Sequence, residues 1–269
     1  MNDNLREFCL RLARHQRSRL LRWLVAGCRG FVQCCENYNY NPKTNGEHHL
    51  IRMLASQSME CVFDVGANVG HWATAVHAVC PSAAIHAFEI VPQTFEQLQR
   101  NTAAVSSIVT NSFGLADREE TVMVRFFHDD PELSSMVAVP YDRPSVNVPS
   151  RTSTGDAYCE QRGIEQIDLL KIDTEGSELL VLRGMSGMIA SGSIDVIQFE
   201  YSRINILSKF LLKDFYDLLD ESHYVIGKLF PNHVAFKPYE LVDETFMGPN
   251  YVAVRRGRSD LIALLSGPV

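Results

Sequence analysis

The chain has 269 residues, 46% of them hydrophobic, which is enough for one large domain with a full core or one domain with an appendage. The formal net charge of −7 argues against a broad nucleic-acid surface, because phosphate binding needs clustered lysine and arginine. The seven cysteines form no CxxC pair and no run approaches the ~20 apolar residues that span a bilayer, so we expect a soluble protein in a reducing cytoplasm.

The first 30 residues form a basic segment. They hold seven arginines against Asp3 and Glu7, a local balance of +5, so the remainder carries −12. Apolar or uncharged side chains recur at three- and four-residue spacing, which predicts an amphipathic helix with an arginine-rich side: Leu5, Phe8, Leu12, Gln16, Leu20, Trp23 and Leu24. Such a helix either packs on its own domain or a partner subunit, the interpretation we favour, or lies on an anionic membrane. The turn-rich segment 36–49 then predicts a boundary, with an extension over 1–45 and a domain over 46–269.

Strand-like and helix-like segments alternate after this boundary. Strands are expected at 61–66 and 83–90, a third strand with a loop at 107–117, and an added β segment at 121–128. Helices are expected at 70–79 and from Pro92 onward, where proline suits the first turn. Residues 129–155 show no period and predict a long loop. A short helix at 155–163 precedes strands at 167–173, 194–201, 224–230 and 250–256, with helices at 177–185 and 210–223 between them.

This alternation predicts an α/β fold with a mostly parallel sheet and helices on both faces. Ligands of such sheets bind beyond the carboxyl ends of the strands. Several polar segments fall there and are expected to converge on one edge of the sheet: 64–70, Glu89, 114–117, Asp173 and Glu200.

The segment CVFDVGANVG at 61–70 joins a buried strand to a helix through two glycines. A glycine turn alone is a weak indication of a ligand, because many α/β sheets need one for structural reasons. Glu89 ends the second strand 23 residues after Gly66, a position that suits a carboxylate accepting hydrogen bonds from both hydroxyls of a ribose. The two features together predict a cofactor that contains ribose.

NAD and S-adenosylmethionine both contain ribose and adenine, so Glu89 does not distinguish them. Asp64 would repel a pyrophosphate at the following helix N-terminus, whereas the ammonium and sulfonium of S-adenosylmethionine suit a nearby acid. The turn also reads GANVG rather than GxGxxG. Asp64 could instead cap the turn, but we favour S-adenosylmethionine as the cofactor.

Three segments resemble the sequence blocks of the FkbM family of S-adenosylmethionine-dependent methyltransferases. They are VFDVGANVGHWA, FEIVPQTFEQLQRN and IDLLKIDTEGSELLVLRGM, which lie between residues 61 and 186, and VIQFEYS with NYVAVRR extends the similarity to about 256. KIDTEGSELLVLRG is the most specific, since the family usually reads close to KIDVEGAELEVLKG. One departure is Ile90, where the family commonly has proline. The N-terminal extension lies outside the resemblance.

The resemblance implies a Rossmann-like class I methyltransferase fold with a mostly parallel seven-stranded sheet. It also implies that the glycine turn approaches the methionine part of the donor, with Asp64 near its ammonium and Asn68 near its carboxylate. Glu89 would hold the ribose, and Ile90 with Leu115 would enclose the adenine, unless Leu115 belongs to the core. The predicted donor-binding residues are Asp64, Gly66, Ala67, Asn68, Gly70, Glu89, Ile90, Gly114 and Leu115.

Methyl transfer to a hydroxyl needs orientation of donor and acceptor and removal of one proton. Asp173 and Glu200 are the predicted catalytic residues, with Glu175 nearby, although Asp173 could instead cap the helix beginning near Gly176. We predict no metal, although such carboxylates would suit magnesium. The fourth strand lacks the Asn/Asp-Pro-Pro-aromatic tetrad of DNA amino methylation, which favours a hydroxyl acceptor.

The acceptor is therefore expected to be a small molecule, sugar or glycan and not a nucleic acid. The irregular regions 129–155 and 231–249 would shape its pocket, but neither contains a sequence motif that identifies the acceptor. Two other classes of protein stay open: an NAD-dependent oxidoreductase, and a non-catalytic binding module that retains a methyltransferase-like fold.

Overall fold

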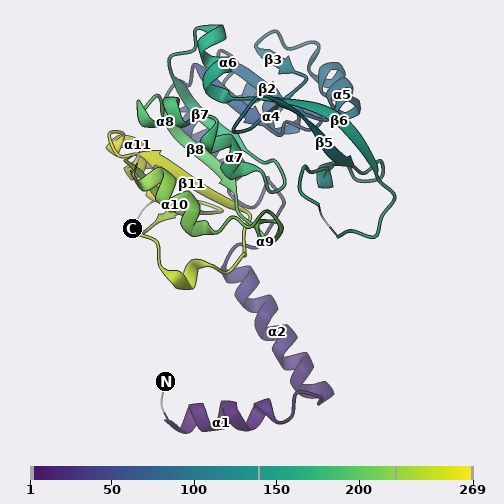
Figure 1. The fold of residues 1–269 in the computed structure, drawn as a ribbon. Coiled ribbons are helices and arrows are strands. Elements are labelled where there is room, and N and C mark those ends of the chain that lie inside the picture. The colour runs from purple at the N-terminus through teal and green to yellow at the C-terminus, as the bar shows by residue number, and fades with distance from the viewer. Residues whose placement is uncertain (1–2, 139, 222, 268–269) are drawn as a thin grey trace.

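The structure, a computed structural model, describes residues 3–138, 140–221 and 223–267. Its centre is an eight-stranded sheet in the order β10-β9-β11-β8-β7-β1-β2-β3 (Figure 1). The parallel strands are β1 (Cys61–Val65), β2 (Ala84–Phe88), β3 (Ile108–Asn111), β7 (Ile167–Ile172) and β8 (Ile194–Glu200). The antiparallel edge is formed by β9 (Tyr224–Phe230), β10 (His233–Phe236) and β11 (Asn250–Arg255).

The strand order creates one topological switch point. The chain moves outward from β1 to β2 and β3, and then returns to place β7 on the other side of β1. The loops that follow β1 and β7 therefore leave the sheet in opposite directions and open a crevice beyond their carboxyl ends. The central strands are buried on both faces, as every residue of β8 is, which is typical of parallel strands covered by helices.

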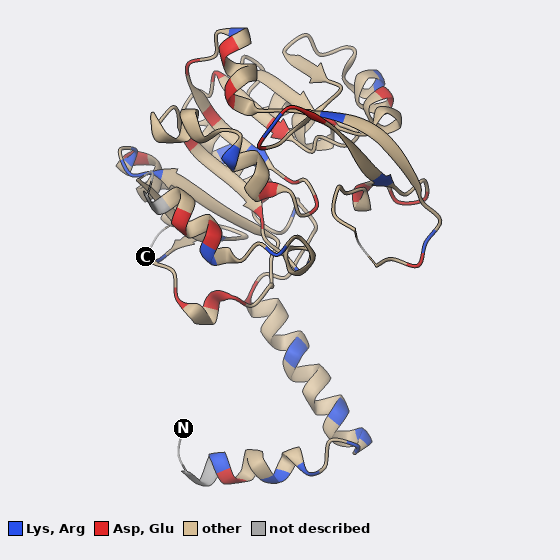
Figure 2. Cartoon of the chain, viewed as in Figure 1, with Lys and Arg blue, Asp and Glu red and all other residues tan. Residues whose placement is uncertain are grey.

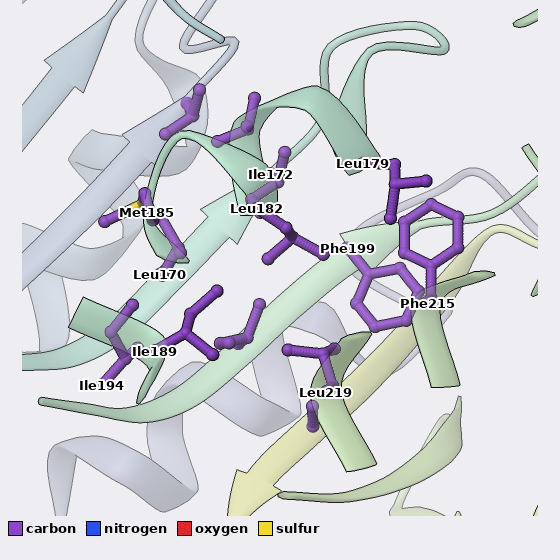
Figure 3. Close-up of a cluster of buried hydrophobic side chains, with 14 of the residues drawn as sticks. Leu170, Ile172, Leu179, Leu182, Met185, Ile189, Ile194, Phe199, Phe215 and Leu219 are labelled. Carbon is purple, nitrogen blue, oxygen red and sulfur yellow. The ribbon is translucent and has the colours of Figure 1, made fainter. Parts of the chain in front are cut away.

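Two hydrophobic clusters hold the helices against the two faces of the sheet. One face packs against α6 (Gly155–Arg162), α7 (Glu178–Arg183), α8 (Ser186–Ala190) and α10 (Leu212–Glu221). Figure 3 shows this cluster, in which the Phe199 and Phe215 rings stack with centroids 4.7 Å apart. The other face packs against α3 (Glu47–Ala55), α4 (His71–Val79), α5 (Pro92–Thr102) and α11 (Ser259–Ser266).

The predicted alternation of strands and helices is confirmed, with two corrections. The sheet has eight strands rather than seven, because β10 forms a hairpin with β9 inside the region 231–249. The predicted loop over 129–155 also contains the short η1 helix (Pro131–Leu133) and the strand β6 (Val146–Ser153). A single short helix, α9 (Asn205–Ser208), precedes α10, and η2 (Leu241–Asp243) precedes β11.

The strand β6 belongs to a second sheet in the order β4-β6-β5, with β4 at Gly114–Leu115 and β5 at Glu120–Phe126. Pro149 pairs with Met123 of β5, while β4 pairs only with Thr152 and Ser153. Pro149 thus lies where β6 has a partner on one side only, an edge position that a proline can occupy. This proline and the surrounding serines explain why the sequence predicted a loop.

The N-terminal segment folds as two helices, α1 (Asp3–Ala13) and α2 (Arg19–Cys35), rather than one. The hydroxyl of Ser18 accepts a hydrogen bond from the Leu21 amide at 3.5 Å, which caps α2 and separates it from α1. No residue of α2 is buried, so the favoured packing of this helix on its own domain is not observed. The domain boundary at 45/46 stays a prediction. Within the described residues, no helix combines the length and apolarity needed to cross a membrane.

Candidate active site

A cavity of about 610 Å³ opens beyond the carboxyl ends of β1, β2, β7 and β8, at the switch point of the sheet. This volume lies within the range of small-molecule sites. The predicted residues that line it are Gly66, Ala67, Asn68, Glu89, Ile90, Gly114, Leu115, Asp173 and Glu200. The structure thus brings together nine of the predicted site residues from five different segments of the chain.

The turn after β1 carries the backbone close to the end of β7. Gly66 has φ +82°, and a Cβ atom there would lie 1.7 Å from the Asp173 carbonyl oxygen. Gly70 also has positive φ (+89°), but its Cβ would meet the Leu98 side chain at 2.8 Å, so this glycine is required by packing. Gly70 does not appear on the cavity wall. Of these two glycines, Gly66 alone combines a steric requirement with a position on the cavity wall.

Glu89 is fixed at the end of β2 by the turn itself. Its carboxylate accepts hydrogen bonds from the Asn68 amide at 2.9 Å and from the Val91 amide at 2.8 Å. The residue is 7% exposed, and this burial raises the pKa of its carboxyl to about 7 even though the backbone donors oppose the shift. Glu89 is thus a positioned carboxyl whose charge is finely balanced near neutral pH.

Lys171 is a central residue of the site that the sequence analysis missed. Its Nζ lies 3.3 Å from Asp64 Oδ1 and 3.2 Å from Asp173 Oδ2. Burial works to lower the pKa of Lys171, but the carboxylates of Asp173 and Asp64 raise it above its ordinary value, so the side chain is a cation. A lysine directly after the apolar pair Leu169–Leu170 in a strand expected to be buried, IDLLKID, was the available signal, because a buried charge requires partners.

Asp64 lies beneath the cavity wall rather than on it. The residue is fully buried and does not line the cavity. Burial raises the pKa of its carboxyl, and Lys171 opposes that shift. The charge of Asp64 is thus compensated by Lys171, so the repulsion of a pyrophosphate that we assigned to a free Asp64 is weakened. A direct contact of Asp64 with a donor stays a prediction. Of the two acids that pair with Lys171, Asp173 is the one that lines the cavity, and its side chain is 40% exposed.

Three carboxylates converge beside Lys171. Oxygen atoms of Asp173, Glu175 and Glu200 lie within 4.8 Å of one another. Burial, reinforced by the neighbouring acids, raises the pKa of Glu175 to about 9 and that of Glu200 well above its ordinary value. Since like charges this close disfavour full ionisation, Glu175 and Glu200 hold a proton more tightly than isolated carboxyls do. The cluster could accept a proton from an acceptor, and its oxygen atoms could hold a divalent cation.

The turn after β7 is shaped by a buried acid that lies outside the cavity. Glu178 Oε1 accepts hydrogen bonds from the amides of Thr174 and Gly176, both at 3.0 Å. These bonds hold the turn in which Glu175 has φ +53°. Glu178, rather than Asp173, therefore caps these two amides before the helix. Asp173 is left free to pair with Lys171.

A second feature missed from the sequence is the segment that precedes α3. Tyr40, Pro42 and Lys43 line the cavity together with His48 from the first turn of α3, although the first three fall in the predicted extension. Two polar atoms of other lining residues, Trp72 Nε1 and Asn68 Oδ1, are buried without a hydrogen-bond partner among the described residues. Buried polar atoms rarely remain unpaired, so these two atoms indicate where a ligand could bind.

The strand order and the cavity define the protein as one with the class I methyltransferase fold. Residues 64–226 match the family model described as the methyltransferase FkbM domain. Because this match covers more than half of the chain, the protein belongs to the FkbM methyltransferase family, as the sequence resemblance predicted.

Curated relatives are methyltransferases of moderate similarity. The hexuronic acid methyltransferase AglP of Haloferax volcanii is 28% identical over 158 residues, which are 57% of this chain and 62% of AglP. The methyltransferase sdnD of Sordaria araneosa is 28% identical over 156 residues, 46% of this chain and 60% of sdnD. The matches thus span about six-tenths of these relatives. A solved FkbM methyltransferase from Methylobacillus flagellatus aligns with 73% of this chain and 44% of its own, with 17% identity and a TM-score of 0.47.

Proposed function

We propose that the protein transfers the methyl group of S-adenosylmethionine to a hydroxyl group of a small molecule or sugar. The observation that carries this proposal is the carboxyl of Glu89, fixed at the end of β2 by the amides of Asn68 and Val91 beside the cavity. A carboxylate so placed can accept hydrogen bonds from both hydroxyls of a ribose. Membership of the FkbM family supports a methyl donor over NAD as the compound that carries this ribose.

The residues around Glu89 are compatible with the rest of the donor. Gly66 contributes backbone to the cavity wall, and the unpaired atoms of Trp72 and Asn68 can bond with the amino-acid part. Ile90 offers apolar surface for adenine, whereas Leu115, although beside the cavity, is 1% exposed and belongs to the core. Gly114 is required there because its Cβ would lie 2.8 Å from Ile90 Cδ1. The donor, once bound, supplies a methyl carbon activated by a sulfonium, a cation that suits an acidic wall.

The carboxylate cluster is proposed to remove the acceptor proton. As the bond from the acceptor oxygen to the methyl carbon forms and the carbon–sulfur bond breaks, the hydroxyl proton must leave. Glu200 or Asp173 can take this proton only in the ionised form. Because burial and neighbouring acids raise the pKa of Glu200, we expect activity to increase toward alkaline pH.

The same wall is suited to an uncharged polyol. Carboxylates accept hydrogen bonds from sugar hydroxyls, and the half-exposed ring of Tyr40 can pack on the apolar face of a sugar ring. A uronic acid, the acceptor class named for the relative AglP, would bring a further negative charge beside Asp173, Glu175 and Glu200. We therefore propose a neutral sugar hydroxyl as the preferred acceptor of this chain.

Incubation with isotopically labelled donor and fractionated glycan, lipid and metabolite extracts should yield a methylated product detectable by mass spectrometry. With that acceptor, Glu200→Gln should lower kcat by about a hundredfold or more, the usual contribution of a positioned base, while donor affinity stays unchanged. Glu119→Gln, on an exposed residue, is the control. Full activity of Glu200→Gln would remove Glu200 as the base, and NADH binding without donor binding would select the oxidoreductase.

We also propose that the protein contacts molecules other than the acceptor. The N-terminal helices would contact a membrane surface or a partner subunit, since α2 exposes its large apolar side chains. A cytoplasmic location remains our prediction, in keeping with seven cysteines that are all free. A non-catalytic binding module would bind the donor without producing any methylated compound.

A further inference from the structure

The two N-terminal helices extend away from the body of the protein (Figure 1). They nevertheless carry large apolar side chains. Trp23 is 74% exposed, Phe31 71% and Leu20 69%, and no residue of α2 is buried. An isolated helix of this length is marginally stable in water, so a surface that covers its apolar side is expected.

The side chains of α2 divide into two faces. At about 100° per residue, Leu20, Leu24, Phe31 and Val32 fall within one arc of the helix. The three arginines, Arg19, Arg22 and Arg29, fall on the opposite side. Trp23 lies near the border between the two faces, the position in which a ring with an apolar body and a polar N–H is favoured at membrane interfaces.

Charge indicates what covers the apolar face. The sequence of α2 contains no acidic residue, and residues 1–30 carry +5 while the remainder carries −12. Figure 2 shows lysine and arginine without acidic neighbours along α2, whereas acidic residues are spread over the body. A second copy of α2 could cover the apolar side chains but would offer the arginines no acidic partner. Anionic lipid offers both an apolar interior and a complementary charge.

We propose that α1 and α2 dock the protein peripherally on an anionic lipid surface, with the apolar face inserted at the level of the headgroups. The helices lie in the interface and do not span it. Helix α1 contributes through Phe8, which is more than half exposed and lies one helical turn from Leu12 on the same side of the helix.

The docked helices are joined to the cavity by an anchored segment. Glu36, directly after α2, pairs with Lys228 at 3.0 Å. The Asn37 side-chain amide donates hydrogen bonds to the carbonyl oxygens of Asn45 and Leu229, at 2.8 and 2.9 Å. Tyr40 and Lys43 then line the cavity. Docking therefore holds one wall of the cavity close to the lipid surface.

The fluorescence of Trp23 can be used to test this proposal. It has two tryptophans, and Trp72 is only 8% exposed, so a change of emission on adding lipid reports on Trp23. Vesicles of phosphatidylcholine with about a third phosphatidylglycerol should bind the full chain and shift its emission to the blue. Vesicles of phosphatidylcholine alone should bind at least about tenfold more weakly, and ~0.5 M salt should weaken binding to the anionic vesicles. Trp23→Phe should abolish the shift while co-sedimentation persists.

Two variants test the two faces. Leu24→Asp with Phe31→Asp should abolish co-sedimentation, and Arg19→Gln with Arg22→Gln and Arg29→Gln should weaken it about a hundredfold, at ~1 kcal/mol per arginine near an anionic surface. Met123→Asp, at an exposed apolar residue of the body, should leave it unchanged. Donor affinity should be the same in all these proteins, which separates this proposal from the proposed activity. Equal binding to neutral and anionic vesicles, no binding to either, or a stable dimer through α2 by light scattering would overturn the proposal.

Discussion

Lys171→Met should lower the free energy of unfolding by about 3–5 kcal/mol, the usual effect of removing one partner of a buried ion pair. The lysine side chain is 6% exposed and bonds with Asp64, which is fully buried, as well as with Asp173. Without Lys171, Asp64 must either remain charged in an apolar environment or take up a proton. Urea unfolding, followed by circular dichroism, measures the change.

Two further variants identify the cause of this loss. Lys171→Met combined with Asp64→Leu should recover most of the stability, because neither charge then remains buried. Lys228→Met is the matched control. That lysine is also largely buried, but its partner Glu36 is 43% exposed, so water can solvate the remaining carboxylate and the loss should stay near ~1 kcal/mol. A loss below about 1 kcal/mol in Lys171→Met would show that the ion pair is not needed for stability.

Donor affinity should increase as pH rises through about 7, because burial raises the pKa of Glu89 to about 7. The ionised carboxylate accepts hydrogen bonds from both ribose hydroxyls, whereas the protonated form can accept fewer. If only the ionised form binds, Kd should increase about tenfold for each pH unit below 7 and become constant above 8. Calorimetry in buffers of different ionisation enthalpy should detect proton release below pH 7.

Glu89→Gln should weaken donor binding by more than tenfold at pH 8, as expected when a buried hydrogen-bonded acid is lost, and should abolish the pH dependence. Glu96→Gln, on the exposed side of α5, is the control and should retain both. Unchanged affinity of Glu89→Gln would exclude Glu89 from the donor site.

The raised pKa of Glu89 should also make the free energy of unfolding depend on pH. The folded-state pKa of Glu89, about 7, exceeds the ordinary value of 4.5, so the native state binds more protons than the unfolded state between these pH values. The contribution of Glu89 to the free energy of unfolding should therefore decrease as pH rises from 4.5 to 7. Glu89→Gln should remove this part of the pH dependence.

The parallel sheet, the glycine turn and the set of acids at the strand ends could be predicted from the amino-acid sequence alone. These features depend on local patterns: continuous apolar runs bounded by turns, and side chains that follow directly after them. Since parallel strands end at one edge, Glu89, Asp173 and Glu200 had to meet there, and the structure places them in one cavity. The family motifs are equally local, which is why they identified the family.

The pairing of these groups, and the other segments that reach them, became evident only from the three-dimensional packing of the chain. Whether Asp64 faces a ligand or Lys171 depends on the register of β1 against β7, which no local pattern specifies. Tyr40 and Lys43 reach the cavity because the Asn37 side chain bonds with Leu229, 192 positions further along the chain. The formation of strand β10 and the exposure of the apolar face of α2 likewise depend on which segments pack beside them. Long-range packing, not residue type, determines these contacts.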